Sequence, residues 1–79
     1  MHPTVKKVKA VKEYQVMLTY DNGEKRLFDM HPYLETGLFA QLKDKELFGT
    51  VRVSFDTIEW GNRLDIDPEV LYLRSVPVS

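Results

Sequence analysis

The chain has 79 residues, 43% hydrophobic and 29% charged, and its 11 basic and 12 acidic side chains leave a formal net charge of -1. We expect residues 1–79 to form a single globular domain, with no overall field that would attract nucleic acid or a membrane surface. The absence of cysteine excludes disulfides, thiolate metal sites and cysteine nucleophiles. Because the sequence shows neither a signal peptide nor an apolar run of membrane-spanning length, we expect a cytoplasmic protein.

The N-terminal segment, residues 5–11, is rich in valine and interleaved with lysine. This pattern predicts an edge strand protected by its charges. The lysines could also contact phosphates, but no arginine or aromatic side chain is interleaved among them. We therefore interpret this face as solvated, and keep as the alternative a nucleic-acid-associated regulator that uses Lys6, Lys7, Lys9 and Lys12.

A β-hairpin is predicted over residues 14–30, with its turn at Asp21-Asn22-Gly23. A two-residue loop at Asn22-Gly23 would send Phe28 to the polar face. A three-residue loop with Gly23 in the left-handed conformation instead places Val16 opposite Phe28. Since a slip of one residue moves every side chain to the other face, we favour the three-residue loop. Its predicted core residues are Tyr14, Val16, Leu18, Phe28 and Met30.

Short helical pieces are predicted next. Residues 32–36 can form about one helical turn between Pro32 and Gly37. A second piece is predicted to have Asp44 as its N-cap residue and to end at Gly49. We expect the apolar residues here to cover the sheet as core: Leu38, Phe39, Leu42, Leu47 and Phe48.

Alternating residues predict a second hairpin, from Val51 to Phe55 and from Ile58 to Trp60, with a turn near Asp56-Thr57. Residues 64–66 are then extended, a last short helix starts at Pro68, and residues 75–79 are expected to fray. The predicted fold is therefore α+β: a small antiparallel sheet of two hairpins plus an N-terminal edge strand, covered on one face by short helices.

The acidic residues Asp65, Asp67 and Glu69 alternate along the chain, and hard cations bind clustered carboxylates. Pro68 turns the chain, however, so that Asp67 can cap the helix and Glu69 lies in its first turn, where negative charge is favoured. We interpret the run as a helix cap and expect no bound metal. A metal-dependent enzyme centred on Asp65 and Asp67 is the weaker alternative.

Catalytic signals are weak throughout the chain. His2 and His31 are the only imidazoles, and no nucleophile is marked by a strained strand-to-helix turn. The four glycines are isolated, so the sequence contains neither a phosphate loop nor a dinucleotide fingerprint. We therefore expect a protein that is not an enzyme and that needs no cofactor.

Trp60, the only tryptophan, has two interpretations. At the end of a strand it is typical of a core residue that closes the fold, with Leu64 and Ile66 packed on it. If it were exposed it would be an interface anchor, because Trp, Tyr and Arg dominate binding hot spots. The candidate binding residues are then Trp60, Arg63 and Tyr72.

The sequence resembles the bacterial domain of unknown function 2442 over nearly its whole length. The resemblance lies in the tyrosine strand followed by Asp21-Asn22-Gly23-Glu24, in Phe28-Asp29-Met30, in Gly37-Leu38-Phe39 to Leu42, and most specifically in Trp60-Gly61-Asn62-Arg63-Leu64-Asp65-Ile66-Asp67-Pro68-Glu69-Val70-Leu71-Tyr72. Family members often have a proline and a glycine around the asparagine, where this chain has Gly61 and Arg63. The loop backbone is therefore expected to differ from the family norm.

The resemblance implies a small bacterial α+β domain without an assigned catalytic residue. Members are often encoded beside a small partner in what look like toxin-antitoxin pairs, and some longer members carry a helix-turn-helix for which this chain has no room. The resemblance thus implies a non-catalytic binding module, antitoxin-like, whose partner is a small toxin. A homodimer would add buried surface to so small a core, and direct nucleic-acid binding is the less favoured alternative.

Overall fold

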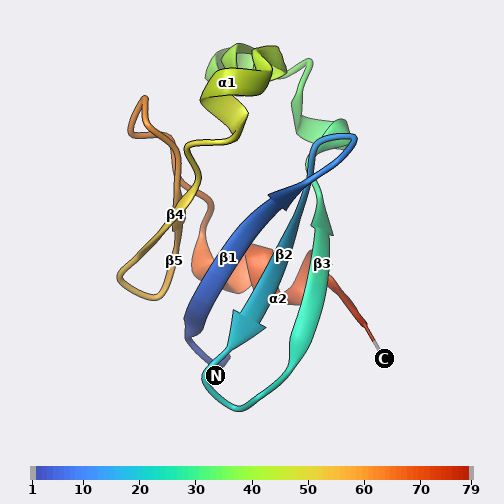
Figure 1. Cartoon of the computed structure of the whole chain (residues 1–79), viewed down its shortest axis with the longest axis vertical. Coiled ribbons are helices and arrows are strands. Elements are labelled where there is room, and N and C mark those ends of the chain that lie inside the picture. The colour runs from blue at the N-terminus through green and yellow to red at the C-terminus, as the bar shows by residue number, and fades with distance from the viewer. Residues whose placement is uncertain (1, 79) are drawn as a thin grey trace.

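The computed structural model describes residues 2–78, and Figure 1 shows how their strands and short helices are arranged. In chain order the elements are β1 (Val5–Val11), β2 (Gln15–Tyr20), β3 (Lys25–Asp29), the 3-10 helices η1 (His31–Tyr33) and η2 (Gly37–Lys43), α1 (Lys45–Phe48), β4 (Arg52–Ser54), β5 (Thr57–Glu59), α2 (Pro68–Arg74) and β6 (Val76–Pro77). The short helices and antiparallel strands confirm the predicted α+β class.

The hairpin of β2 and β3 has the predicted register. Val16 pairs with Phe28, and Tyr20 N–H donates a hydrogen bond to Glu24 O across a three-residue loop. Gly23 in that loop has φ +90°, a conformation that a side chain would strain. The pairing buries Val16, Leu18, Phe28 and Met30, whereas Tyr14 lies half-buried in the turn before β2.

The N-terminal strand β1 pairs antiparallel with β2 and forms one edge of the first sheet, as predicted. Its register shifts between Val5 and Lys7, which leaves Lys6 as an extra residue in the strand. Val8 and Ala10 therefore face inward opposite Leu18 and Val16. The lysines Lys6, Lys7, Lys9 and Lys12 are all exposed.

The second hairpin differs from the prediction in two respects. It forms a two-stranded sheet of its own beside β1, instead of extending the first sheet, because alternation predicts strands but not which strands pair. Its turn also falls one residue earlier, since Ser54 pairs with Thr57 around Phe55 and Asp56. Phe55 is thereby removed from the strand and is 95% exposed.

The helical region between β3 and β4 follows the predicted local signals. Asp44 accepts a hydrogen bond from Glu46 N–H and caps α1, which ends before Gly49. Leu42 and Phe48 are buried, and Phe39 and Leu47 pack partly against the core. Leu38 is 63% exposed, so its assignment to the core was wrong: the 3-10 helix directs it to solvent.

The last helix, α2, covers one face of the first sheet (Figure 1). The core enclosed by these elements consists of Val5, Val16, Leu18, Tyr20, Phe28, Met30, Leu34, Leu42, Phe48, Ile58, Trp60, Ile66 and Leu71. The tail does not fray at once after α2, because Val76–Pro77 pair with β3 as strand β6. Ser79 lies outside the described residues. No helix within residues 2–78 is long and apolar enough to cross a membrane.

Candidate functional site

Of the three candidate binding residues, Trp60 is fully buried. Its indole N–H donates a 3.0 Å hydrogen bond to Phe48 O, and its ring packs against the Phe48 ring. Trp60 is therefore the core residue of the first interpretation and is not accessible as an anchor. Arg63 is exposed and has φ +71°. Tyr72 is half-buried and contacts Glu24 and Arg26.

The acidic run is a helix cap. Asp67 Oδ1 accepts hydrogen bonds from the backbone N–H groups of Glu69 and Val70, which satisfies two free donors at the start of α2. Asp65 forms an isolated bridge with Glu59. Among residues 2–78, no group of three or more His, Cys, Asp or Glu side chains is placed to hold a metal ion.

Tyr72 belongs to a polar cluster that joins β3 to the end of α2. Arg26 donates to Ser75 Oγ (2.6 Å), to Ser75 O (2.9 Å) and to Glu24 Oε1 (2.9 Å). Its guanidinium carbon lies 4.4 Å from the centre of the Tyr72 ring, and Tyr72 OH donates to Glu24 Oε2. The Arg26 side chain is only 12% exposed. Every polar group here has a partner within the chain, so the cluster holds β3 to the end of α2 and has few free donors or acceptors for a ligand. We call this cluster of Glu24, Arg26, Tyr72 and Ser75 the clasp.

Tyr20 lies beside this clasp, with its ring edge-on to Tyr72. Its hydroxyl is buried and has no hydrogen-bond partner within the described residues. Burial raises the pKa of Tyr20 to about 12, and the charges of Glu24 and Tyr72 act in the same direction against the opposing effect of Arg26.

We expect Tyr20→Phe to stabilise the fold by about 1 kcal/mol at pH 7, because it removes an unpaired buried donor and keeps the ring. It should also reduce alkaline destabilisation. A folded-state pKa above the unfolded value of 10.0 gives stability that is present below pH 10 and lost as pH rises toward about 12. Urea unfolding at pH 7 and pH 11 measures both effects. A lower stability at pH 7 would contradict this account of the hydroxyl.

The surface with the strongest binding character is the face of the first sheet opposite α2, which we call the open face. No element of residues 2–78 covers it, and the strands that form it lie in front of α2 in Figure 1. Register places ten side chains on this face: Lys7, Lys9 and Val11 from β1, Gln15, Met17 and Thr19 from β2, Lys25, Leu27 and Asp29 from β3, and Val76 from β6.

An apolar row crosses the middle of the open face. Met17 pairs with Leu27, and Leu27 pairs with Val76, so three apolar side chains on adjacent strands are direct neighbours. Val76 is 56% exposed, and Met17 and Leu27 are partly exposed without packing on the core. The row ends on β1 at Lys9, which pairs with Met17.

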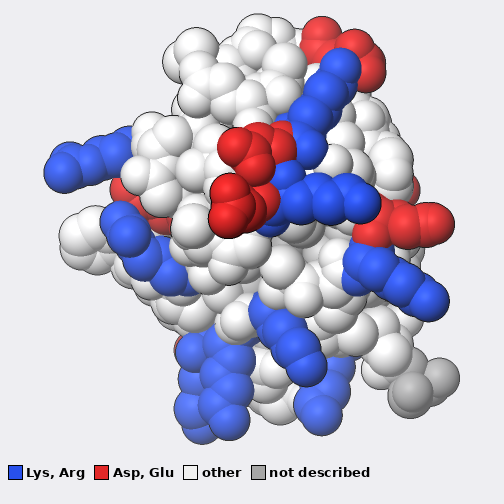
Figure 2. Space-filling model, turned by 45° about the horizontal axis from the view of Figure 1, so that its top comes forward, with Lys and Arg blue, Asp and Glu red and all other residues white. Residues whose placement is uncertain are grey.

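The charges around this row are mainly positive. Lys7, Lys9 and Lys25 are exposed, and within residues 2–78 none of them lies within 4.0 Å of a carboxylate oxygen. The one carboxylate on the face, Asp29, is paired with His31 Nδ1 at 2.6 Å. Figure 2 shows lysine and arginine side chains gathered over the lower part of the surface in view. The open face can therefore contact an apolar surface bordered by acidic groups.

Sequence reasoning assigned these apolar residues no function. Alternation already placed Met17 on the face opposite Val16 and Leu18, and the three-residue loop places Leu27 beside it. Val76 had no signal, because the tail was expected to fray and a two-residue strand is too short for a pattern.

The fold and the open face define a small α+β domain with one side of its main sheet left uncovered. A family model for proteins of unknown function, DUF2442, matches residues 5–77 of the chain. The chain belongs to that family, which confirms the resemblance seen in the sequence. Neither the curated proteins nor the solved structures contain a significant match to the chain.

Proposed function

We propose that the chain is a non-catalytic binding module that docks a protein partner on the open face. The observation that supports this most is the row of Met17, Leu27 and Val76, which lies across the three strands β2, β3 and β6 without covering elements. A domain of this size has few apolar side chains to spare from its core, and a contiguous group of them left on its surface is typical of an interaction site. The partner we infer has an apolar patch with aspartate or glutamate around it.

An antitoxin-like role is consistent with this proposal. A small toxin encoded beside the gene is the first partner to test, because the family resemblance implies such pairs. Coexpression of the two proteins, followed by pull-down and native mass spectrometry, should give a stable complex. If no complex forms with the neighbouring gene product, the antitoxin-like role fails, while a different acidic partner would still fit the open face.

Leu27→Asp is expected to weaken the complex on the order of 100-fold, because the new carboxylate would be desolvated within the apolar row. The fold should tolerate the change, since Leu27 does not pack on the core. Titration calorimetry measures the binding, and circular dichroism verifies the fold. Leu73→Ser is the matched control: Leu73 is a leucine on α2 with 68% exposure, and its replacement should leave binding unchanged. Equal binding by folded Leu27→Asp would contradict the proposed surface.

Nucleic acid is the alternative ligand, and it would bind the lysines on and just after the edge strand β1. Lys6, Lys7, Lys9 and Lys12 are exposed, but the open face presents no aromatic side chain on which bases could stack. A salt-dependent mobility shift that is lost when these four lysines are changed to glutamate would favour the regulator over the protein-binding module.

A further inference from the structure

Phe55 is the most exposed large apolar side chain in residues 2–78, at 95%. It occupies the tip of the β4–β5 hairpin with φ +55°, a conformation that favours glycine, asparagine or aspartate in two-residue hairpin loops. The hairpin is fixed elsewhere, by fully buried Ile58 and by the hydrogen bond from Thr57 Oγ1 to Ile66 O. Phe55 therefore adds nothing to the packing of its own chain.

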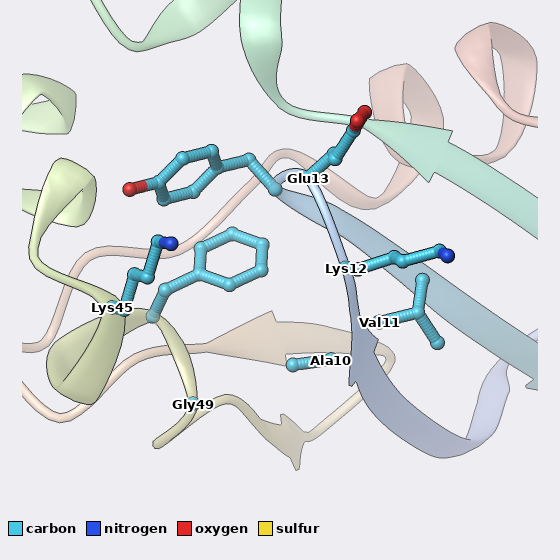
Figure 3. A pocket seen from close by; sticks show the side chains of 8 residues that line it. Ala10, Val11, Lys12, Glu13, Lys45 and Gly49 are labelled. Carbon is cyan, nitrogen blue, oxygen red and sulfur yellow. The ribbon is translucent and has the colours of Figure 1, made fainter.

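A cavity of about 260 Å³ opens between the end of β1 and α1 (Figure 3). Its walls are mainly apolar and include the rings of Tyr14 and Phe48, which are edge-on to each other. Ala10 and Gly49, with a small side chain and none, also line it. Apolar cavities of about 150 Å³ already accept benzene, so this one has room for an aromatic ring.

We propose that the Phe55 ring of one copy occupies this cavity in a second copy, forming a two-fold dimer with two such contacts. The tip of the β4–β5 hairpin lies toward the lower end of β1 in Figure 1, whereas the end of α1 that leads into β4 lies beyond its upper end. A two-fold axis perpendicular to β1 exchanges these two positions. Each ring can then meet the cavity of the other copy, as an isologous interface requires.

Charge complementarity supports a second copy as the occupant. Asp56 follows Phe55 at the hairpin tip, and Lys12 and Lys45 lie at the cavity. None of these three side chains forms an ion pair within residues 2–78. When the ring enters the cavity, the Asp56 carboxylate arrives beside ammonium groups that lack a partner. Glu13 also lines the cavity, with Lys12 directly before it in the chain.

Sedimentation equilibrium of the full chain tests the proposal. We expect the mass to approach twice 9.2 kDa as concentration rises. Phe55→Asn should raise the dimer dissociation constant about 30-fold or more, because it removes both rings. Its thermal midpoint, measured at a concentration where the wild type is monomeric, should be unchanged or higher, since asparagine tolerates the left-handed conformation. Leu73→Ser, which removes an exposed leucine from α2, should dimerise normally.

Gly49→Leu tests the cavity side of the contact. A Cβ at Gly49 would meet only Glu46 O and Lys45 O, both at 3.5 Å, so the fold should accept a side chain that fills the cavity. Each variant alone should be monomeric, and an equal mixture of Phe55→Asn and Gly49→Leu should form a heterodimer through the one remaining contact. Native mass spectrometry resolves the two masses. A wild type that stays monomeric up to about 1 mM, or a Phe55→Asn variant that dimerises as the wild type does, would overturn the proposal.

Discussion

Trp60→Ala is expected to destabilise the domain by about 3–5 kcal/mol, a large part of the 5–15 kcal/mol that holds a typical small domain folded. The ring is fully buried, so its removal leaves a large cavity in the core. The change also deprives Phe48 O of the 3.0 Å hydrogen bond from the indole N–H. Both losses fall on the contact between Phe48 at the end of α1 and Trp60, the residue that follows β5.

Trp60→Phe separates these two contributions. It keeps an aromatic ring for the packing against Phe48 and loses only the hydrogen bond and part of the volume, so we expect a smaller loss of about 1–3 kcal/mol. Urea unfolding followed by far-ultraviolet circular dichroism gives both values. An anchor for a partner would behave in the opposite way, with binding lost and stability kept. A Trp60→Ala variant as stable as the wild type would contradict the buried role.

Local signals in the sequence were sufficient for much of the fold. The hairpin register followed from the cost of moving Phe28 to the polar face, and both helix caps followed from an aspartate placed before the helix. The sequence could not predict the division into two sheets, because short alternating strands contain no information on their neighbours. Phe55 was assigned to a strand for the same reason, since alternation does not fix where a turn begins.

The candidate site was harder to predict than the fold. An exposed apolar residue and a core residue look alike in a sequence, and the neighbouring pair Met17 and Leu27 became part of a row only when the structure placed Val76 beside Leu27. Trp60 is the opposite case: tryptophan is typical of binding hot spots, but here its side chain is fully buried in the core. Whether a side chain binds a partner or fills the core is decided by which element covers it, and that depends on contacts distant in sequence.

Arg26→Ala is expected to lower the free energy of unfolding by about 2–4 kcal/mol at pH 7. Arg26 is largely buried, and two of its three donated hydrogen bonds hold Ser75, and with it strand β6, against β3. The variant leaves Ser75 O and Glu24 Oε1 without the hydrogen bonds that Arg26 donates to them. Because β6 contributes Val76 to the open face, we also expect weaker binding of the proposed partner. Guanidinium unfolding and calorimetric titration measure the two effects.

Arg52→Ala provides the matched control. Arg52 also pairs with a glutamate on a strand, Glu59 at 3.5 Å, but its side chain is 58% exposed, and such pairs contribute about 0–1 kcal/mol. A large loss of stability for Arg52→Ala and a small one for Arg26→Ala would contradict the stabilising role of the clasp. The stability of Arg26→Lys should lie between those of the wild type and Arg26→Ala, because lysine keeps the charge but cannot donate hydrogen bonds in the geometry of the guanidinium group.

The same clasp gives an expected pH dependence. Hydrogen bonds from Asn22 and Tyr72, and then from Arg26, lower the pKa of Glu24 below its usual value of 4.5. A lowered folded-state pKa gives stability that is present above pH 4.5 and is lost as pH falls through the folded value. The stability difference between the wild type and Arg26→Ala should therefore be greatest near neutral pH and shrink in acid. A difference that stays constant from pH 7 to pH 3 would show that Arg26 acts through Ser75 and Tyr72 and that its ion pair with Glu24 adds nothing.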